Sequence, residues 1–306
     1  KYWYSHDEPY SQDAYVPMHI VDSLVQEAGG SPLITEFYPY WGITVNGDSQ
    51  LVKYYNTVKP EKLMIDYYPA VPDYIPTRWE DFESTRMQFQ IAHSLQPGFW
   101  YVGQGFGFRL QNNSWCIWRK PEPTELSAAI MLALAHGSKG IMFWNYDSYS
   151  SSSDYCGPYY VDCIVDDQLD PTSLYDLIKN NLAPRLNGAL GSTLLNLDYS
   201  GNYLPLKRFN SPNSLPPAHF DFLTMTFNGN GDCNFHSGFF ENSSQPDNNY
   251  FLTANILTTS ANNVNMIVTK SNQNYTNYRF RNVEPQFSLD TTFNSSLNID
   301  YTFPAG

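Results

Sequence analysis

The stretch Ala133-Leu-Ala-His-Gly-Ser-Lys-Gly-Ile-Met-Phe-Trp144 joins a helical pattern to a strand pattern within twelve residues. Upstream, Thr124 is a suitable N-cap for a run with apolar residues at helical spacing, and Gly137 ends that run. Downstream, residues 140–146 are largely aliphatic and aromatic, which is typical of a buried strand. A helix that leads through a short glycine loop into a strand is the repeating step of an α/β fold.

The same alternation extends from the N-terminus to about residue 198. Strands are predicted at residues 1–7, 32–39, 62–69, 98–105 and 140–146. Helices are predicted at residues 13–28, 49–58, 79–95, 124–137 and 173–190, the first with an apolar stripe at Val16, Ile20, Leu24 and Ala28 and the last with Gly191 as its C-cap. Strands separated by helices predict a parallel sheet, because parallel neighbours need a crossover connection.

The last third of the chain has a different pattern. From about Tyr199 to Gly306 it is rich in Asn, Ser, Thr and aromatic residues, with short alternating runs such as residues 249–255 and 264–269. This pattern favours an antiparallel β-sandwich. We therefore predict an α/β domain at residues 1–198 and a β-sandwich domain at residues 199–306.

Charge and hydropathy exclude two kinds of partner. The chain has 17 basic and 30 acidic residues, a net charge of −13, and no cluster of Lys and Arg, so a nucleic-acid partner is not expected. No apolar run is long enough to span a bilayer. Aromatic residues make up 16% of the chain, and flat apolar rings suit the faces of sugars.

Cysteine and asparagine usage favours an extracellular protein. Cys156 and Cys163 flank a short loop and could form a disulfide in an oxidising compartment. None of the cysteines has the close spacing of a zinc site, so neither a metal ion nor a cofactor is predicted. N-glycosylation sequons, which would make the chain a glycoprotein, begin at Asn112, Asn242, Asn274 and Asn294.

Two adjacent carboxylates end the first predicted strand. The aromatic run Tyr2-Trp-Tyr4 favours a strand, and Pro9 cannot donate to a ladder, so Asp7 and Glu8 fall where pairing stops. One interpretation is that they cap the following helix. The other is that they are catalytic, because the active sites of barrel enzymes lie at the C-terminal ends of the strands.

Several short motifs resemble one family. They are His6-Asp-Glu-Pro9, Phe37-Tyr-Pro39, Ile65-Asp-Tyr-Tyr-Pro69, Phe99-Trp-Tyr-Val-Gly-Gln104 and, most specifically, Ala133 to Trp144. In this order they resemble strands four to eight of the (β/α)8 barrel glycoside hydrolases of the clan A-like superfamily. Some bacterial members pair such a barrel with a C-terminal β-sandwich, and the run from Phe239 to Ala254 resembles its first hairpin.

The resemblance implies a partial barrel. Eight strands close a barrel of this kind, and five are predicted here. Either strands one to three lie upstream or the sheet is open, and the resemblance favours a fragment that covers strands four to eight. Its end, Phe303-Pro-Ala-Gly306, resembles the turn before a final sandwich strand. A further partner would then be the upstream segment of the same protein or an extracellular assembly.

The resemblance also assigns roles to two strand ends. In the commonest pattern of the family, a glutamate at the end of strand four is the acid/base and one at the end of strand seven is the nucleophile. Glu8 matches the first position. At the second position the chain has Gln104, whose amide can neither attack a sugar as a carboxylate nor deprotonate water.

Three alternatives follow from this departure. Asp7 could orient the acetamido group of a substrate that serves as its own nucleophile, as in substrate-assisted hexosaminidases, provided that the strand ends or bulges to bring Asp7 and Glu8 to one side. Asp66 could supply the second carboxylate, or it could be a structural acid bonded to a neighbouring strand end. In the third alternative the barrel binds sugar, or serves as a scaffold, without catalysis.

Aromatic residues at the strand ends are candidates for binding a sugar. We predict substrate-binding roles for Tyr38, Tyr67, Gln104 and Trp144. Tyr40, Trp41 and Tyr68 cluster at the same strand ends, and strand alternation places Tyr4 and His6 on the face of Glu8.

The predicted function is a glycoside hydrolase-like protein that acts on extracellular carbohydrate. It would be retaining or substrate-assisted, with Glu8 as acid/base. The alternative is a non-catalytic carbohydrate-binding or assembly protein that keeps a hydrolase fold.

Overall fold

The computed structural model describes residues 1–9, 11–37, 50–72, 77–109, 118–150, 159–209, 216–227, 229, 231–259, 261–269, 278–284 and 289–305. The chain forms two compact units. The first contains residues 1–121 and 136–170, and the second contains residues 122–135 and 171–306. Within the described ranges, no helix is both long and apolar enough to cross a membrane.

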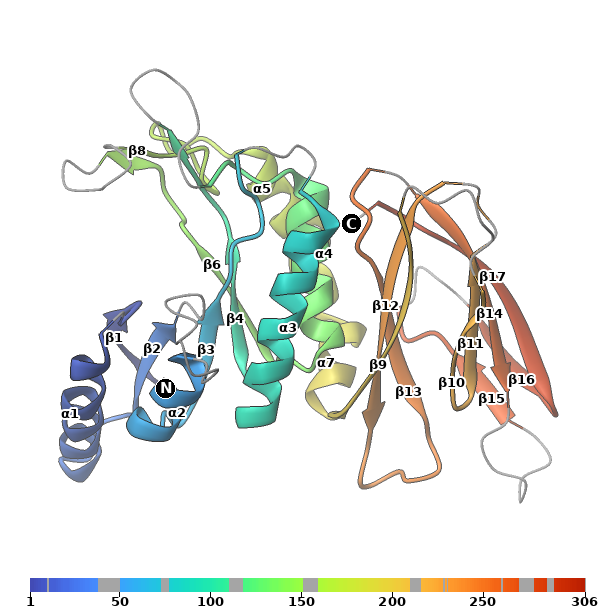
Figure 1. Cartoon of the computed structure of the whole chain (residues 1–306), viewed down its shortest axis with the longest axis horizontal. Helices are drawn as coiled ribbons and strands as arrows, with labels where there is room; N and C mark the ends of the chain where they lie inside the picture. The colour runs from blue at the N-terminus through green and yellow to red at the C-terminus, as the bar shows by residue number, and fades with distance from the viewer. Residues whose placement is uncertain are drawn as a thin grey trace. The chain divides into compact units, whose positions relative to one another are not determined.

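The first unit is built on a parallel sheet of five strands in the order β1-β2-β3-β4-β6 (Figure 1). The strands are β1 (Trp3–Asp7), β2 (Leu33–Phe37), β3 (Met64–Asp66), β4 (Trp100–Gln104) and β6 (Gly140–Trp144). The first three connections contain α1 (Tyr15–Glu27), α2 (Gln50–Val58) and α3 (Trp79–Leu95). The predicted strands, crossover helices and parallel sheet are confirmed.

Aromatic rings fill the space between this sheet and its helices. Tyr15 of α1, Phe37 of β2 and Tyr54 of α2 contact one another, with the rings of Phe37 and Tyr54 stacked 4.5 Å apart. Phe89 of α3 contacts both Phe99 and Tyr101 beside and within β4. The aromatic residues of the strand motifs therefore form much of the core of this unit.

Helix α1 packs on the sheet through an unusually polar face. Tyr15 and Asp22 are buried, and the Asp22 carboxylate accepts a hydrogen bond from the backbone N–H of Leu33 at 2.7 Å. The His19 ring bonds the Val58 carbonyl at the end of α2. The apolar stripe that predicted this helix is exposed.

A small antiparallel sheet completes the first unit. It is formed by β5 (Gly107–Arg109), β8 (Tyr159–Val161) and β7 (Tyr149–Ser150) in that order. Phe106, Phe108 and Cys163 are buried together with Tyr68, with Tyr160 packed against them. Cys156, the predicted disulfide partner of Cys163, lies outside the described residues, so that pairing stays a prediction.

Helices open the second unit. Helix α4 (Pro123–Ala135) is buried on all sides from Glu125 onward. Residues 173–195 form α5 (Ser173–Leu177), a π-helical turn (Ile178–Leu182), α6 (Ala183–Asn187) and α7 (Ala189–Leu195). The predicted C-cap at Gly191 is wrong, because Gly191 is a buried residue inside α7 and the helical path breaks earlier, at Gly188.

The remainder of the second unit is antiparallel. One sheet has the order β13-β12-β9 and another the order β10-β11-β14-β17, while β15 pairs with β16. Their bounds are β9 (Asp198–Arg208), β10 (Ala218–Phe220), β11 (Leu223–Phe227), β12 (Cys233–Glu241), β13 (Tyr250–Asn255), β14 (Asn262–Thr269), β15 (Tyr278–Arg281), β16 (Asp290–Phe293) and β17 (Ser296–Phe303).

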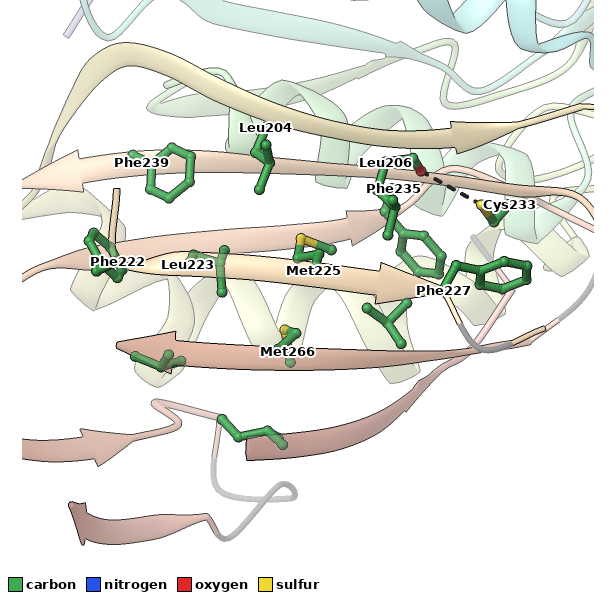
Figure 2. Close-up of a cluster of buried hydrophobic side chains, with 13 residues drawn as sticks. Leu204, Leu206, Phe222, Leu223, Met225, Phe227, Cys233, Phe235, Phe239 and Met266 are labelled. Atoms are coloured by element: carbon green, nitrogen blue, oxygen red, sulfur yellow. Dashed lines mark hydrogen bonds between the residues drawn. The ribbon is translucent and has the colours of Figure 1, made fainter. Parts of the chain in front are cut away.

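The two larger antiparallel sheets share one apolar core, which makes them a β-sandwich (Figure 2). Phe235 and Phe239 of β12 and Leu204 of β9 face Met225 of β11 and Met266 of β14. The buried thiol of Cys233 lies 3.9 Å from the Leu206 carbonyl, as the dashed line shows.

The architecture is therefore a parallel half-barrel with helices, followed by antiparallel sheets, as the sequence predicts. The β-strands of the second unit begin at Asp198. The domain boundary at residues 198/199 itself stays a prediction, because the compact second unit also takes in α4 and residues 171–197.

Candidate functional site

Three neighbouring strands end on acidic residues. Asp7 ends β1 and Glu8 follows it, Glu36 lies near the end of β2, and Asp66 ends β3. In the parallel register Asp7 is opposite Glu36. Because the C-terminal ends of parallel strands meet at one edge of the sheet, these four carboxyl groups gather there.

An irregularity in β1 brings Asp7 and Glu8 to this group together. The pairing of β1 with β2 shifts by one residue between Tyr4 and His6, where the Ser5 hydroxyl bonds the Ile34 carbonyl and the Thr35 hydroxyl. Glu8 then adopts a left-handed backbone conformation with φ of 40°, while its N–H still bonds the Glu36 carbonyl. The strand has thus bulged and ended, which removes the alternation that would separate two adjacent side chains.

The same bulge changes which residues share a face. The Tyr4 hydroxyl reaches Asp7, three residues away, rather than following a simple period of two with His6 and Glu8. His6 is exposed.

Glu36 is the centre of the cluster. Its side chain is only 2% exposed, and its two oxygens accept hydrogen bonds from the hydroxyls of Tyr68 and Tyr4, each at 3.1 Å. Burial raises the pKa of Glu36 to about 8, with the Asp7 charge next in effect, a smaller contribution from Glu8, and the two tyrosine bonds opposing the rise. Glu36 is therefore largely protonated at neutral pH.

Tyr4 joins Glu36 to Asp7. Its hydroxyl oxygen lies 2.7 Å from Asp7 Oδ1 and 3.1 Å from Glu36 Oε2. The two carboxyl oxygens therefore lie no more than about 6 Å apart, the sum of these two distances. A phenol hydroxyl has one proton, so both contacts are hydrogen bonds only when one of the two carboxyl groups is itself protonated.

Asp66 and Glu8 form a second pair. Asp66 is fully buried, and neither of its oxygens has a hydrogen-bond partner among the described residues, although Glu8 lies close enough for its charge to act on Asp66. Burial, followed by the charges of Glu36 and Glu8, raises the pKa of Asp66 well above its usual range.

The end of β4 is built differently. The Gln104 amide, 2% exposed, accepts a bond from the Ala70 N–H and donates to the carbonyls of Phe106 and Arg119. A carboxylate could not donate to those two carbonyls. Gln104 thus holds together the segments that follow β3 and β4, and its predicted contact with sugar stays a prediction.

The aromatic candidates are placed as follows. Tyr67 is buried, and its carbonyl accepts a bond from the Tyr101 hydroxyl. Trp144 is half-buried and packs against the cluster of Tyr68 and Phe106. Tyr38, Tyr40 and Trp41 lie outside the described residues.

The four carboxyl groups differ in their access to solvent. Asp7 is exposed and Glu8 is half-buried, whereas Glu36 and Asp66 are buried. Each pair therefore joins a group that a solute can touch to a buried partner that favours its protonated form. Within the described part of the chain, no set of three or more His, Cys, Asp or Glu residues is arranged to hold a metal ion.

The sequence reasoning missed Glu36. A signal for it exists, because Glu36 is the only charged residue in the otherwise buried strand Leu33–Phe37. Lone acids in apolar strands are rarely buried without a hydrogen-bonding or catalytic partner.

Comparison with solved structures finds distant likenesses. No protein-family model matches the chain, and no curated protein matches it. Among solved structures, a catalytic mutant of Gan42B, a GH42 beta-galactosidase from G. stearothermophilus, matches with 16% sequence identity and a TM-score of 0.34. The match covers 56% of this chain and 23% of that chain, so the chain matches less than a quarter of the length of that protein.

Proposed function

We propose that the protein is a glycoside hydrolase-like enzyme that acts on carbohydrate, with Glu8 as its acid/base. The observation that carries the proposal is the pairing of accessible and buried carboxyl groups at the C-terminal ends of β1, β2 and β3. Enzymes that cleave a glycosidic bond usually use two carboxyl groups held in different environments.

The proton comes from the pair of Glu8 and Asp66. Asp66 is too deeply buried to meet a substrate, and in the proposal it shares a proton with the more accessible Glu8. In the proposed step, Glu8 gives this proton to the leaving oxygen as the bond to the anomeric carbon breaks. In the second step, the Glu8 carboxylate takes a proton from the attacking water.

Asp7 supplies the second carboxylate. The bulge in β1 ends the alternation that would separate Asp7 from Glu8, and the Tyr4 hydroxyl lies 2.7 Å from the Asp7 carboxylate. In a substrate-assisted reaction Asp7 orients the acetamido group whose oxygen attacks the anomeric carbon. In a retaining reaction the Asp7 carboxylate itself attacks. The retaining and substrate-assisted routes thus differ in whether the substrate needs an acetamido group.

Substrate contacts and location complete the proposal. Tyr38, Tyr67, Gln104 and Trp144 remain the proposed sugar-binding residues, and the location remains extracellular, as composition and sequons favour.

A non-catalytic carbohydrate-binding or assembly protein is the second candidate. Gln104 favours it, because this amide occupies the position where the family pattern has its nucleophile and is fully engaged by backbone groups. Such a protein would keep the carboxyl cluster to hold sugar hydroxyls rather than to break bonds.

The test is a hydrolysis screen with chromogenic glycosides, including N-acetylhexosaminides and the corresponding hexosides. We expect release of chromophore by the wild-type protein and a loss of about 10²–10⁴-fold in kcat for Glu8→Gln. Hydrolysis restricted to N-acetylhexosaminides would select the substrate-assisted route, and hydrolysis of both series the retaining route.

Glu61→Gln is a matched control, because Glu61 is an exposed glutamate of the same unit, away from the strand ends. A folded wild-type protein that hydrolyses nothing but binds an oligosaccharide array would contradict the enzymatic proposal and support the second candidate. Equal activity of wild type and Glu8→Gln would exclude Glu8 as acid/base.

A further inference from the structure

The hydrogen bonds of Tyr4 depend on which neighbouring carboxyl group carries a proton. Its hydroxyl oxygen lies 2.7 Å from Asp7 Oδ1 and 3.1 Å from Glu36 Oε2. A phenol donates one proton and also accepts through its oxygen, so both contacts are satisfied when it donates to one carboxyl group and accepts from the other. The second proton therefore belongs either to Glu36 or to Asp7.

Three features place this proton on Glu36. Glu36 is 2% exposed, whereas Asp7 is exposed, so that water can hydrate its charge. The contact with Asp7 is the shorter of the two, as expected when a hydroxyl donates to an ionised carboxylate. Burial, followed by the charge of Asp7, raises the pKa of Glu36 to about 8. At neutral pH Glu36 is then the neutral acid and Asp7 the anion.

Tyr68 determines which oxygen of Glu36 holds the proton. The Tyr68 hydroxyl lies 3.1 Å from Glu36 Oε1, and it is a donor there because burial, followed by nearby carboxyl charges, raises its pKa well above the usual range. Oε1 therefore accepts, and the proton is on Oε2, which contacts Tyr4. The bonds then run in one direction, from Tyr68 to Glu36, from Glu36 to Tyr4 and from Tyr4 to Asp7.

We propose that Glu36 is the positioning residue for Asp7: its proton bonds the Tyr4 oxygen, so the Tyr4 proton is directed to the Asp7 carboxylate and holds it in one orientation. Glu36 touches no substrate and keeps its proton throughout. The catalytic part of this inference rests on the proposed function, in which Asp7 must be an anion to attack the anomeric carbon or to orient the acetamido group. The order of the hydrogen bonds does not rest on it.

Carboxyl groups and phenols face Glu36 at the ends of the strands. The groups with the largest effects on its proton are Asp7, Tyr68, Tyr4 and Glu8, and the charge of Glu36 acts in turn on Asp66. These neighbours cannot offset a negative charge on Glu36.

The opposite face of β2 is occupied differently. There Asp22 of α1 accepts the Leu33 N–H, and Tyr54 of α2 bonds Thr35. Neither side chain is directed to Glu36.

The arrangement is therefore sensitive to alkaline pH. As pH rises through about 8, Glu36 becomes an anion that repels Asp7 and competes with it for the Tyr4 proton. The positioning of Asp7 should be lost over the same range.

The first experiment needs no substrate. Protein labelled with ¹³C in the carboxyl carbons of Asp and Glu is titrated by NMR from pH 4 to 10, with Asp7→Asn and Glu36→Gln to assign the two signals. We expect the Asp7 signal to show a step near pH 8, where Glu36 titrates, and Tyr4→Phe to remove that step. An Asp7 signal without this step, or a step that persists in Tyr4→Phe, would overturn the proposal.

The second experiment measures kcat/KM from pH 5 to 10 with the chromogenic glycosides of the hydrolysis screen. We expect a decline that begins near pH 8, where Glu36 ionises. Glu36→Leu, which can neither donate to Tyr4 nor accept from Tyr68, should lower kcat by about 10–100-fold. Glu36→Gln can do both, so it should recover most of that loss and should lack the alkaline decline.

A double variant tests whether Glu36 acts through Tyr4. In the Tyr4→Phe background, Glu36→Leu should cause less than about twofold further loss of kcat, because the connection to Asp7 is already broken. The full loss in that background, or an alkaline decline that persists in Glu36→Gln, would count against the proposal.

Asp22→Asn is the matched control. Asp22 is also a buried acid of the first unit, but it bonds Gln26 and the Leu33 N–H, which an asparagine oxygen can still accept. This variant should keep both the Asp7 step and the alkaline decline. A wild-type protein that hydrolyses no glycoside would contradict the proposed function alone, and the NMR titration would then decide the order of the hydrogen bonds.

Discussion

One parallel sheet contains the C-terminal ends of β1, β2 and β3 and that of β4. The buried polar side chains at the first three ends and at the fourth have different partners. At the first three ends, four carboxyl groups approach one another, and the charges that most affect Glu36 and Asp66 are those of other carboxyl groups. At the end of β4, the Gln104 amide has backbone partners for both its oxygen and its nitrogen.

This difference distinguishes the candidate site, at the ends of β1, β2 and β3, from the structural connection that Gln104 makes at the end of β4. A satisfied amide contributes stability at every pH, whereas carboxyl groups packed together stabilise the fold only while they keep their protons. Natural proteins keep such unfavourable clusters mainly where chemistry needs them. The carboxyl cluster should therefore tolerate neutral substitutions that the end of β4 does not tolerate.

The largest effect on stability is expected from replacing the Gln104 amide at the end of β4 with a carboxylate. Gln104→Glu places a carboxylate against the carbonyls of Phe106 and Arg119, and should lower the free energy of unfolding at pH 7 by about 3–5 kcal/mol. Chemical denaturation monitored by tryptophan fluorescence measures it. Gln104→Met keeps the volume without the charge and should cost less; an unchanged stability of Gln104→Glu would mean that the amide is not a structural connection.

The second effect is a dependence of the free energy of unfolding on pH, caused by the titration of Glu36. Its pKa is raised in the folded protein to about 8, so the folded state binds the proton more tightly than the unfolded state. The contribution of Glu36 to stability should therefore be largest at low pH, where both states are protonated. It should fall by up to about 1.4 kcal/mol per pH unit as pH rises from near 4.5 to 8.

Glu36→Gln removes this titration. Its free energy of unfolding, measured from pH 4 to 9, should have a shallower slope than the wild type and exceed the wild-type value at pH 9. Parallel slopes for the two proteins would show that Glu36 titrates normally.

A smaller effect is expected at Asp66. Asp66→Asn replaces a buried acid, whose pKa is raised by burial and by the charges of Glu36 and Glu8, with a neutral amide. It should stabilise the protein by roughly 1–3 kcal/mol at pH 8. The gain should vanish near pH 4, where Asp66 is protonated in the wild type. Thermal unfolding at the two pH values measures it, and the same gain at both would assign the effect to packing.

The smallest effect is expected at Tyr4. Tyr4→Phe removes the hydroxyl between Asp7 and Glu36 and should cost about 0.5–1.5 kcal/mol, because the exposed Asp7 can bond water instead. Glu36, with one acceptor bond fewer, should protonate at still higher pH, which infrared bands of its carboxyl group would report. Tyr2→Phe is the control, since Tyr2 bonds the exposed Glu61 outside the cluster.

The sequence could predict the strands and helices of the half-barrel because each has a local signal. Aliphatic and aromatic runs marked the parallel strands, and apolar residues at helical spacing followed by glycine marked α1 and α4. Gly191 misled the prediction of the last helix, because a glycine required by close packing and one required for a C-cap look alike in sequence; a Cβ at Gly191 would lie 1.7 Å from the Leu186 carbonyl oxygen.

The candidate site was predictable only in part. Glu8, Asp7 and Asp66 could be proposed from their places at strand ends, but their pairing depends on the bulge at Ser5, which no residue type announces. Glu36 was missed because it precedes the strand end by one residue. The structural bonds of Gln104 come from Ala70 and Arg119, far away in sequence, and only the fold brings these groups together.

The packing of helix α4 against β12 affects how the chain folds during its synthesis. Gly238 of β12 approaches the C-terminal end of this helix so closely that a Cβ there would lie 1.7 Å from the Ala135 carbonyl oxygen. On a ribosome, α4 would emerge roughly 100 residues before β12, a delay of about 5–20 s at ~5–20 residues per second. During this interval α4, which is buried from Glu125 onward in the folded protein, lacks the strand that will cover it and exposes an apolar surface that a chaperone can bind.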